Sequence, residues 1–258
     1  MQSLRDPLTW TDSDGVFYVY GGIGKKSINY LNSHLSDHNG QILQQMWKST
    51  DNGISWNLLW SPVSGTSVEN SPGQRSASVT YTIGHYLYLF GGKCVDSNTN
   101  SLKFCSDLYE WNGEQWNILW IRETEGPSAR AFATNWLDDN NNLWIFGGFG
   151  LGNDGRLLDD LWKWDGSVWT EMRISGPSAQ MKTASWSIGN DLYLWDSSFQ
   201  QTGTLWKYNG DWSIVTVSSL INPVTLEGAV GWKVDQSFYM YGGIDGILYN
   251  FCFLLTIL

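Results

Sequence analysis

Short runs of apolar and aromatic residues, each closed by a polar turn, recur along the whole chain. Four of them, FYVYGG, YLYLFGG, LWIFGG and FYMYGG, end in paired glycines at Gly22, Gly92, Gly148 and Gly243. LYLWDS, at residues 192–197, is a further version without the glycines. The runs are rich in aromatic and β-branched residues and are broken by glycine, asparagine and aspartate turns, which indicates strands rather than helices. The pattern therefore predicts an all-β fold.

These runs belong to five repeated units with one internal order. Each unit has a first strand, a polar turn, the glycine-ended run, a variable loop and a tryptophan-rich hairpin. DLYEWNGEQWNIL at residues 107–119 and DLWKWDGSVWTEM at residues 160–172 are two copies of that hairpin. The repeats cover approximately residues 5–60, 72–120, 127–173, 177–217 and 223–258. Four strands per unit, at a period of about 50 residues, predict the blades of a β-propeller.

The 17 tryptophans of the chain suit this architecture. A lone four-stranded sheet exposes two faces, which neighbouring blades must bury. Trp111 with Trp116, and Trp164 with Trp169, flank the turns of their hairpins. We expect these side chains to fill the wedge between twisted sheets, with their indole N–H groups near the polar edge. We expect the paired glycines to adopt positive φ or to permit close approach of backbone.

Together these elements resemble the kelch-repeat family of β-propellers, within the galactose oxidase/kelch-type superfamily. The resemblance rests on the double glycine after an aromatic strand, on Tyr109 or Trp162 in the next strand, and on a tryptophan a short turn later. That last tryptophan is found at Trp56, Trp116, Trp169 and Trp212. The match covers about residues 5–248, and it implies a single kelch-type propeller domain over residues 1–258.

The number of blades departs from the family's pattern. Kelch propellers usually close with six or seven blades, whereas this chain repeats the unit five times. Unit five lacks the second tryptophan and ends in the apolar stretch LYNFCFLLTIL. Two alternatives follow from this: a propeller closed by atypical end strands, or a partial propeller from a longer kelch protein with further blades or flanking domains.

Charge and composition narrow the range of partners and locations. The formal net charge is −10 and the pI is near 4.6. A surface for nucleic acid or an anionic membrane needs an excess of lysine and arginine, so we expect neither partner. The apolar C-terminal stretch is far shorter than the roughly 20 residues of a membrane span. No signal-peptide pattern and no Asn-x-Ser/Thr sequon occur, which favours a cytoplasmic location.

The three cysteines do not form a disulfide framework. Cys94 and Cys105 flank one predicted loop, and Cys252 lies near the C-terminal end. In an oxidising compartment the first two would staple that loop, but the compartment decides whether such a pair forms. We therefore favour two free thiols at Cys94 and Cys105.

We expect a binding surface on one face of the propeller. In an up-and-down blade, the loops between strands 2 and 3 share a face with the connections between blades. The variable 2–3 loops are residues 23–45, 93–106 and 149–159. Loops of variable length on a rigid scaffold are where binding usually resides. The candidate ligand- or partner-binding residues on this face, close to the central axis, are Arg5, Arg75 and Arg130.

Two interpretations of these arginines remain open. They bind a ligand or partner; alternatively, each pairs with a neighbouring carboxylate or carbonyl and holds the blades together. Repetition at equivalent positions favours the structural interpretation. We assign Arg5 the place in unit one that Arg75 and Arg130 hold in units two and three.

No metal site is expected. His34 and His38 have the i, i+4 spacing of zinc ligands on a helix. Their surroundings lack the apolar register of a helix, so we expect a polar insertion there. WTDSDG at residues 10–15 and LDDNNN at residues 137–142 lack the ligand pattern of a calcium loop, so we expect ordinary turns.

Four acidic residues fall on the predicted binding face, namely Glu123, Glu125, Asp159 and Asp160. Paired carboxylates can perform acid–base catalysis or recognise basic partners, but spacing in sequence does not show that they converge in space. We expect solvated loop charges. Neither a catalytic constellation nor a cofactor site is predicted.

The resemblance implies a non-enzymatic protein–protein interaction module, which binds another protein through its 2–3 and interblade loops. The alternative class is a kelch-like propeller enzyme or sugar-binding protein of the acidic-sugar mutarotase type, which needs only an arginine and a general acid or base. Copper oxidation is disfavoured because the chain has three histidines, and His85 lies at a turn on the face opposite to His34 and His38. A further alternative is a fragment of a longer kelch protein.

Overall fold

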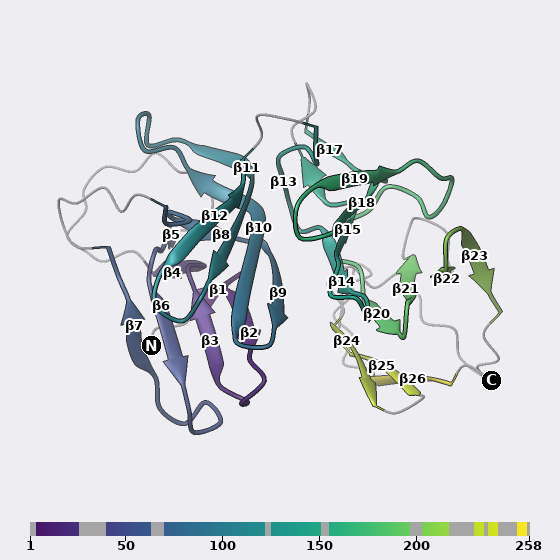
Figure 1. The fold of residues 1–258 in the computed structure, drawn as a ribbon, viewed down its shortest axis with the longest axis horizontal. Helices are drawn as coiled ribbons and strands as arrows, with labels where there is room; N and C mark the ends of the chain where they lie inside the picture. The colour runs from purple at the N-terminus through teal and green to yellow at the C-terminus, as the bar shows by residue number, and fades with distance from the viewer. Residues whose placement is uncertain are drawn as a thin grey trace. The chain divides into compact units, whose positions relative to one another are not determined.

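The structure is a computed structural model that describes most of the chain as strands and turns (Figure 1). The described residues are 4–25, 40–62, 70–121, 125–150, 155–196, 203–216, 230–234, 237–241 and 252–256. None of these segments forms a helix that is long and apolar enough to cross a membrane. The chain divides into two compact units, Met1–Thr124 with Ser128–Ala131, and Glu125–Pro127 with Phe132–Leu258. The predicted single domain over residues 1–258 stays a prediction.

The first unit contains two antiparallel blades of four main strands each, and the short strand β8 also pairs with blade 2. Blade 1 has the strand order β2 (Leu8–Thr11), β3 (Phe17–Tyr20), β6 (Met46–Ser49) and β7 (Asn57–Trp60). Blade 2 has the order β9 (Val79–Ile83), β10 (Tyr86–Val95), β11 (Leu102–Trp111) and β12 (Trp116–Trp120). Shorter strands accompany the blades in this unit: β1 (Leu4–Arg5), β4 (Ile23–Lys25), β5 (Gly40–Ile42), β8 (Arg75–Ser76) and β13 (Arg130–Ala131).

The second unit contains two further four-stranded blades and a three-stranded sheet. Blade 3 is formed by β14 (Thr134–Leu137), β15 (Leu143–Phe146), β18 (Leu161–Trp164) and β19 (Trp169–Met172). Blade 4 is formed by β20 (Ser185–Ile188), β21 (Asp191–Asp196), β22 (Thr204–Tyr208) and β23 (Trp212–Val215). The last sheet is β24 (Val230–Val234), β25 (Ser237–Tyr241) and β26 (Cys252–Thr256). A short hairpin of β16 (Phe149–Gly150) and β17 (Arg156–Leu157) completes the unit.

These sheets confirm the predicted all-β class and the four-strand repeat. Each predicted first strand, glycine-ended run and tryptophan-rich hairpin of the four complete blades forms strands at the expected places. In the last sheet, the apolar C-terminal stretch supplies a strand, because Cys252–Thr256 pairs antiparallel with Ser237–Tyr241. The stretch thus takes a regular place in a sheet.

The core of the first unit is built where blade 2 meets blade 1, around Trp116. The Trp116 ring lies 6.2 Å from that of Trp10 and 5.5 Å from that of Tyr20, both in blade 1. Within its own hairpin it pairs across the strands with Trp111. This confirms that hairpin tryptophans fill the space between blades. The Nε1 atom of Trp116 is buried and has no hydrogen-bond partner in the described part of the chain, so the expectation that it reaches a polar edge was wrong.

The second unit repeats this packing between blades 3 and 4. The ring of Trp212 lies 6.5 Å from that of Trp136 and 5.8 Å from that of Phe146. First-strand tryptophans also donate to the second strand of the next blade. Nε1 of Trp136 donates to the backbone oxygen of Tyr193 at 3.2 Å, and Trp10 in the first unit does the same toward blade 2. Indoles therefore join neighbouring blades through both packing and hydrogen bonds.

The paired glycines allow the next blade's backbone to approach. Gly147 has a φ of +64°, and a Cβ atom there would lie 2.5 Å from the backbone oxygen of Gln180, the residue that opens blade 4. A Cβ atom at Gly91 would lie 2.7 Å from the backbone oxygen of Arg130. Residues other than glycine rarely adopt such a positive φ, and a Cβ atom this close to a backbone oxygen would clash with it. Both expectations for the double glycine, positive φ and close approach, are thus confirmed.

The acidic 1–2 turns are ordinary turns, as predicted. Asp12 Oδ1 accepts from the backbone nitrogens of Asp14 and Val16. Asp138 Oδ1 accepts in the same way from Asn140 and Asn142. In each turn the aspartate therefore satisfies backbone donors that would otherwise be exposed at a tight bend.

Candidate binding site

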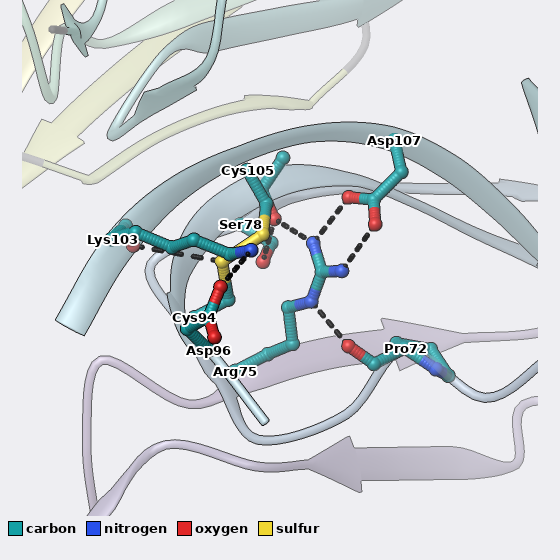
Figure 2. The surroundings of a disulfide bond; sticks show 9 residues. Pro72, Arg75, Ser78, Cys94, Asp96, Lys103, Cys105 and Asp107 are labelled. Carbon is teal, nitrogen blue, oxygen red and sulfur yellow. Dashed lines mark hydrogen bonds and ion pairs between the residues drawn. A yellow bond between two sulfur atoms is a disulfide. The ribbon is translucent and has the colours of Figure 1, made fainter. Parts of the chain in front are cut away.

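Arg75 is held in a buried ion pair at the start of blade 2 (Figure 2). Its Nη1 and Nη2 atoms each lie 2.6 Å from a carboxylate oxygen of Asp107. Nη1 also donates to the backbone oxygen of Gly91 at 2.8 Å, and Nε donates to that of Pro72. The side chains of Arg75 and Asp107 are 3% and 20% exposed. This bidentate geometry is the strong form of an arginine–carboxylate interaction.

The surroundings keep both partners charged. Burial alone would lower the pKa of Arg75, but the neighbouring charge of Asp107 outweighs burial and raises it. Burial alone would raise the pKa of Asp107, but the charge and hydrogen bonds of Arg75 hold that pKa below its ordinary value. Each charge therefore stabilises the other in a place where a single charge would be costly.

The backbone of Arg75 joins blade 2 to blade 1. Its oxygen accepts from the nitrogen of Gly22, and its nitrogen donates to the oxygen of Leu43. Gln180 makes the equivalent contacts in the second unit, with Gly148 and Leu158. The contacts of Arg75 are those of the structural interpretation, in which it pairs with a carboxylate and carbonyls and joins blades. Its binding of a ligand stays a prediction.

Arg130 is buried in a comparable position. It is 1% exposed, and it donates from Nε to the backbone oxygen of Ser128 at 3.0 Å and from Nη2 to Ser128 Oγ at 3.1 Å. A ligand-binding role for Arg130 likewise stays a prediction. A ligand would have to reach a guanidinium that the protein itself surrounds.

Arg5 does not occupy the place assigned to it. Leu4 pairs with Gly24, two residues after the glycine pair of blade 1, just as Arg75 pairs with Cys94 after the pair of blade 2. The residue equivalent to Arg75 is therefore Leu4. A shift of one residue turns a strand side chain to the opposite face, and the Arg5 side chain is 48% exposed, with Asp6 at 3.7 Å. The prediction that Arg5 is equivalent to Arg75 was wrong. The binding role of Arg5 stays a prediction.

The predicted loop at residues 93–106 is instead a hairpin that extends blade 2. Strand β10 continues past its glycine pair to Val95, and β11 begins at Leu102. The register shifts between Phe90 and Gly92, which marks a bulge. A bulge bends a strand and re-aims it, so the two strands run on beyond the four-stranded sheet. Only residues 96–101 remain as a turn.

Cys94 and Cys105 form a disulfide across this hairpin, so the interpretation as two free thiols was wrong (Figure 2). The pairing of β10 with β11 places their Cα atoms 6.1 Å apart, within bonding range. The bond lies beside the buried ion pair, because Cys94 pairs with Arg75 and Cys105 precedes Asp107 by two residues. We name residues 93–106 the stapled hairpin.

The tip of the stapled hairpin is ordered by Asp96. Its Oδ1 accepts from the backbone nitrogens of Asn98 and Thr99, and its Oδ2 pairs with Lys103 Nζ at 2.8 Å. The hydrogen bond from Lys103, followed by those from the backbone, lowers the pKa of Asp96. Residues 97–103 are exposed, so the hairpin presents a polar tip with a defined backbone.

The other two predicted loops are only partly described. In 23–45, strands β4 and β5 pair with each other, and residues 26–39, with His34 and His38, lie outside the described residues. In 149–159, β16 and β17 pair around residues 151–154, which are also outside them. Within the described ranges no group of three or more potential metal ligands occurs.

The predicted acidic residues have different surroundings. Glu123 lies outside the described residues, and Asp159 is exposed. Asp160 accepts from Trp162 Nε1 at 2.7 Å. Glu125 lines an open cavity of about 520 Å³ in the second unit, together with residues of the blade 3 hairpin. Of the four carboxylates, Glu125 therefore lies in a concave site.

Sequence reasoning missed two groups of residues. Asp107, the partner of Arg75, was not singled out, although Asp107 and Asp160 both stand two residues before the aromatic residue of the repeated hairpin. The cavity residues of blade 3, such as Glu171 on β19 and Arg173 directly after it, were also not singled out. A comparison of the four hairpins position by position would have marked Glu171.

Comparisons with known proteins agree with the fold. No protein-family model matches the chain. It is 33% identical to tRNA wybutosine-synthesizing protein 4 of Emericella nidulans over 95 residues, which is 33% of this chain and 8% of that protein. It is 30% identical to N-acetylneuraminate epimerase of Vibrio cholerae over 91 residues, which is 34% of this chain and 23% of that protein. The chain therefore spans less than a quarter of the length of either relative.

Both relatives are kelch-type propeller proteins. With its repeated four-stranded antiparallel blades, this chain has the all-β fold of the kelch-type propeller. The fold class predicted from the double glycines and hairpin tryptophans is confirmed. Fold alone does not define an activity, because packing residues carry the repeat.

Proposed function

We propose that the chain is a non-enzymatic interaction module that binds another protein through the stapled hairpin and the neighbouring interblade segments. The main support for this proposal is the hairpin itself, which departs from the repeat and presents an exposed tip at residues 97–103. The disulfide and Asp96 order this tip before any partner arrives. A pre-ordered element binds with a smaller loss of conformational entropy.

The anchoring of the hairpin supports the same proposal. Asp107 and Gly91 are fixed by Arg75, and Arg75 is fixed in turn by the interblade segment that starts at Pro72. The 2–3 hairpin and the interblade connection of blade 2 thus share one buried ion pair. Binding elements held on a rigid scaffold in this way are typical of interaction surfaces.

The state of the carboxyl groups favours binding over acid–base catalysis. In the described part of the chain, every carboxyl group whose pKa departs from its ordinary value has a lowered pKa. Burial opposes this at Asp107 and Asp138, but the charge and hydrogen bonds of Arg75 favour the anion at Asp107, and hydrogen bonds favour it at Asp138. The groups are Asp51, Asp96, Asp107, Asp138 and Asp165. A general acid at neutral pH needs the opposite shift.

Affinity capture with matched variants tests the proposal. Leu102 at the hairpin and Ile118 on β12 are both 40% exposed and belong to the same unit. Leu102→Arg places a charge on the proposed interface, whereas Ile118→Arg places it on the outer strand of blade 2. Capture from cells that make the chain should lose a specific protein with Leu102→Arg and retain it with Ile118→Arg. If both variants captured that protein equally well, the hairpin would not be its binding site.

A second candidate is supported by the similarity to N-acetylneuraminate epimerase. It is the acidic-sugar enzyme or sugar-binding protein expected as the alternative class. Its test is a titration of the intact chain with N-acetylneuraminate, followed by NMR of the sugar's anomeric signals. Binding with faster exchange between anomers would favour this candidate. No binding at millimolar concentration would eliminate it.

A further inference from the structure

One position of the repeated hairpin breaks the repeat in blade 3. The fourth strand places a residue opposite the aromatic residue of the third strand. The pairs are Trp47 with Leu58, Tyr109 with Ile118, Trp162 with Glu171, and Trp206 with Ile214. Three blades thus carry an exposed aliphatic side chain there, and blade 3 carries a carboxylate. A residue needed only for packing would follow the repeat.

Glu171 lines the open cavity of about 520 Å³ on this hairpin. The cavity size falls in the usual range for small-molecule sites, about 300–1,000 Å³. Trp162, Thr170, Arg173 and Glu125 line it as well. All of these residues belong to the second unit.

The polar groups of the cavity form a connected set. Arg173 Nε donates to Glu171 Oε2 at 2.7 Å, and the Arg173 side chain is 86% exposed. The hydrogen bond and charge of Glu171, with a smaller contribution from Glu125, raise the pKa of Arg173. The guanidinium therefore lies within the influence of two carboxylates. The cavity offers acceptors and donors side by side.

An indole adds an apolar surface to this polar set. Trp162 is half-buried, and its Nε1 bond to Asp160 fixes the orientation of the ring. Aromatic side chains with a satisfied polar end bind ligands that have both an apolar face and polar groups. Hydroxyl groups both donate and accept, so they match a carboxylate and a guanidinium that lie together.

The hydrogen-bonding chemistry of the cavity favours some ligands over others. Glu125 and Glu171 accept hydrogen bonds, and the exposed guanidinium of Arg173 donates them. The hydroxyl groups of a neutral polyhydroxylated ligand can bond to both kinds of group, whereas a carboxylate only accepts and an ammonium only donates. We propose that this cavity binds a neutral sugar, with Trp162 against the ring and the Glu171–Arg173 pair on neighbouring hydroxyls.

The test is a saturation-transfer NMR titration of the intact chain with neutral, acidic and cationic sugars. The probes are glucose, galactose, mannose and N-acetylglucosamine as neutral sugars, N-acetylneuraminate as the acidic one, and glucosamine as the cationic one. At least one neutral sugar should bind with a millimolar dissociation constant, more tightly than either charged sugar. No signal from any neutral sugar at tens of millimolar would overturn the proposal, as would stronger binding of a charged one.

Variants then place the binding site. Glu171→Ile introduces a residue that blades 2 and 4 already carry at this position, so the fold should tolerate it. Loss of a charged hydrogen-bond partner should weaken sugar binding by about tenfold. Ile118→Glu is the control, because it makes the reverse exchange in blade 2. Binding that survives Glu171→Ile unchanged would overturn the assignment to this cavity, and unfolding midpoints would verify that both variants are folded.

Discussion

Arg75 and Arg173 each pair with a carboxylate, but in opposite surroundings. Both bond to a carboxylate within 2.7 Å, but their side chains are 3% and 86% exposed. A buried charge that loses its partner stays desolvated, whereas an exposed one is compensated by water and salt. We therefore expect the two pairs to have different roles: the first holds the fold, and the second stays accessible to a ligand.

We predict that Arg75→Met lowers the free energy of unfolding by about 3–5 kcal/mol, because it leaves Asp107 buried without its partner. Arg173→Met makes the same chemical change at an exposed site and should leave the unfolding midpoint where it is. Urea unfolding monitored by tryptophan fluorescence measures both. If the two variants are equally stable, the Arg75–Asp107 pair does not hold the fold.

The same pair predicts a dependence of stability on pH. The pKa of Asp107 is lower in the folded state than in the unfolded state, whose value is about 3.9. Its contribution to stability is therefore complete above that value and is lost as pH falls through the folded-state pKa. Asp107→Asn should be less stable than the wild type at about pH 7, and the difference should shrink below about pH 4. A difference that grows with acid in urea titrations would contradict this linkage.

At the scale of elements, the stapled hairpin shows what a strand extension adds to a repeated blade. Its strands continue β10 and β11, and its tip is closed by Asp96 and the disulfide. The exposed tip thus lies at the end of two long strands of 10 residues each. The cross-link limits the conformations that this element can adopt when its strands separate.

We predict that the paired change Cys94→Ser with Cys105→Ser destabilises the hairpin by about 3 kcal/mol, from the loop entropy of a cross-link over 11 residues. Amide hydrogen exchange should accelerate at residues 93–106. The amides of β14 and β15 in blade 3 serve as the internal reference and should not change. Unchanged exchange in the hairpin would mean that strand pairing alone orders it.

The strands were predictable from the sequence and the extended hairpin was not, for physical reasons. The alternation of tyrosine with leucine in YLYLF, at residues 86–90, directly indicates a strand with one more buried face. KCVDSNTNSLKFC has the polar composition of a loop, because its strands pair with each other beyond the packed blade. Its order depends on the bulge at the glycine pair and on a disulfide, which local sequence patterns do not reveal.

The candidate site was predictable in part. The arginine positions were visible as repeats, but the burial of Arg75 depends on Asp107, which pairs with it from 32 residues away. The one-residue offset of Arg5 depends on strand register, which the sequence leaves open at a two-residue strand. The cavity on blade 3 depends on how Glu125 approaches the hairpin, and this is a tertiary contact.

At the scale of the whole molecule, neighbouring blades bury each other through their tryptophans, as Trp116 does on blade 1 and Trp212 on blade 3. Sheets that depend on their neighbours unfold together when the interfaces are strong. These interfaces lie within each unit. If residues 1–258 form the single domain that the sequence predicts, the chain should unfold in one transition. Arg75→Met in the first unit and Leu194→Ala in the second, a core residue with 0% exposure, should lower the same midpoint. Two transitions, each moved by one variant only, would contradict the single domain.

The repeated residues build the scaffold, and the residues that depart from the repeat are the ones proposed to bind. The most direct test of this division is site-specific photo-crosslinking on the intact, oxidised chain. A benzoylphenylalanine probe would replace Leu102 at the stapled hairpin, or Ile118 at a repeated position of equal exposure. The account predicts a covalent adduct with a partner protein from the probe at 102 and none from the probe at 118. Adducts at 118 alone, or at neither position, would contradict it.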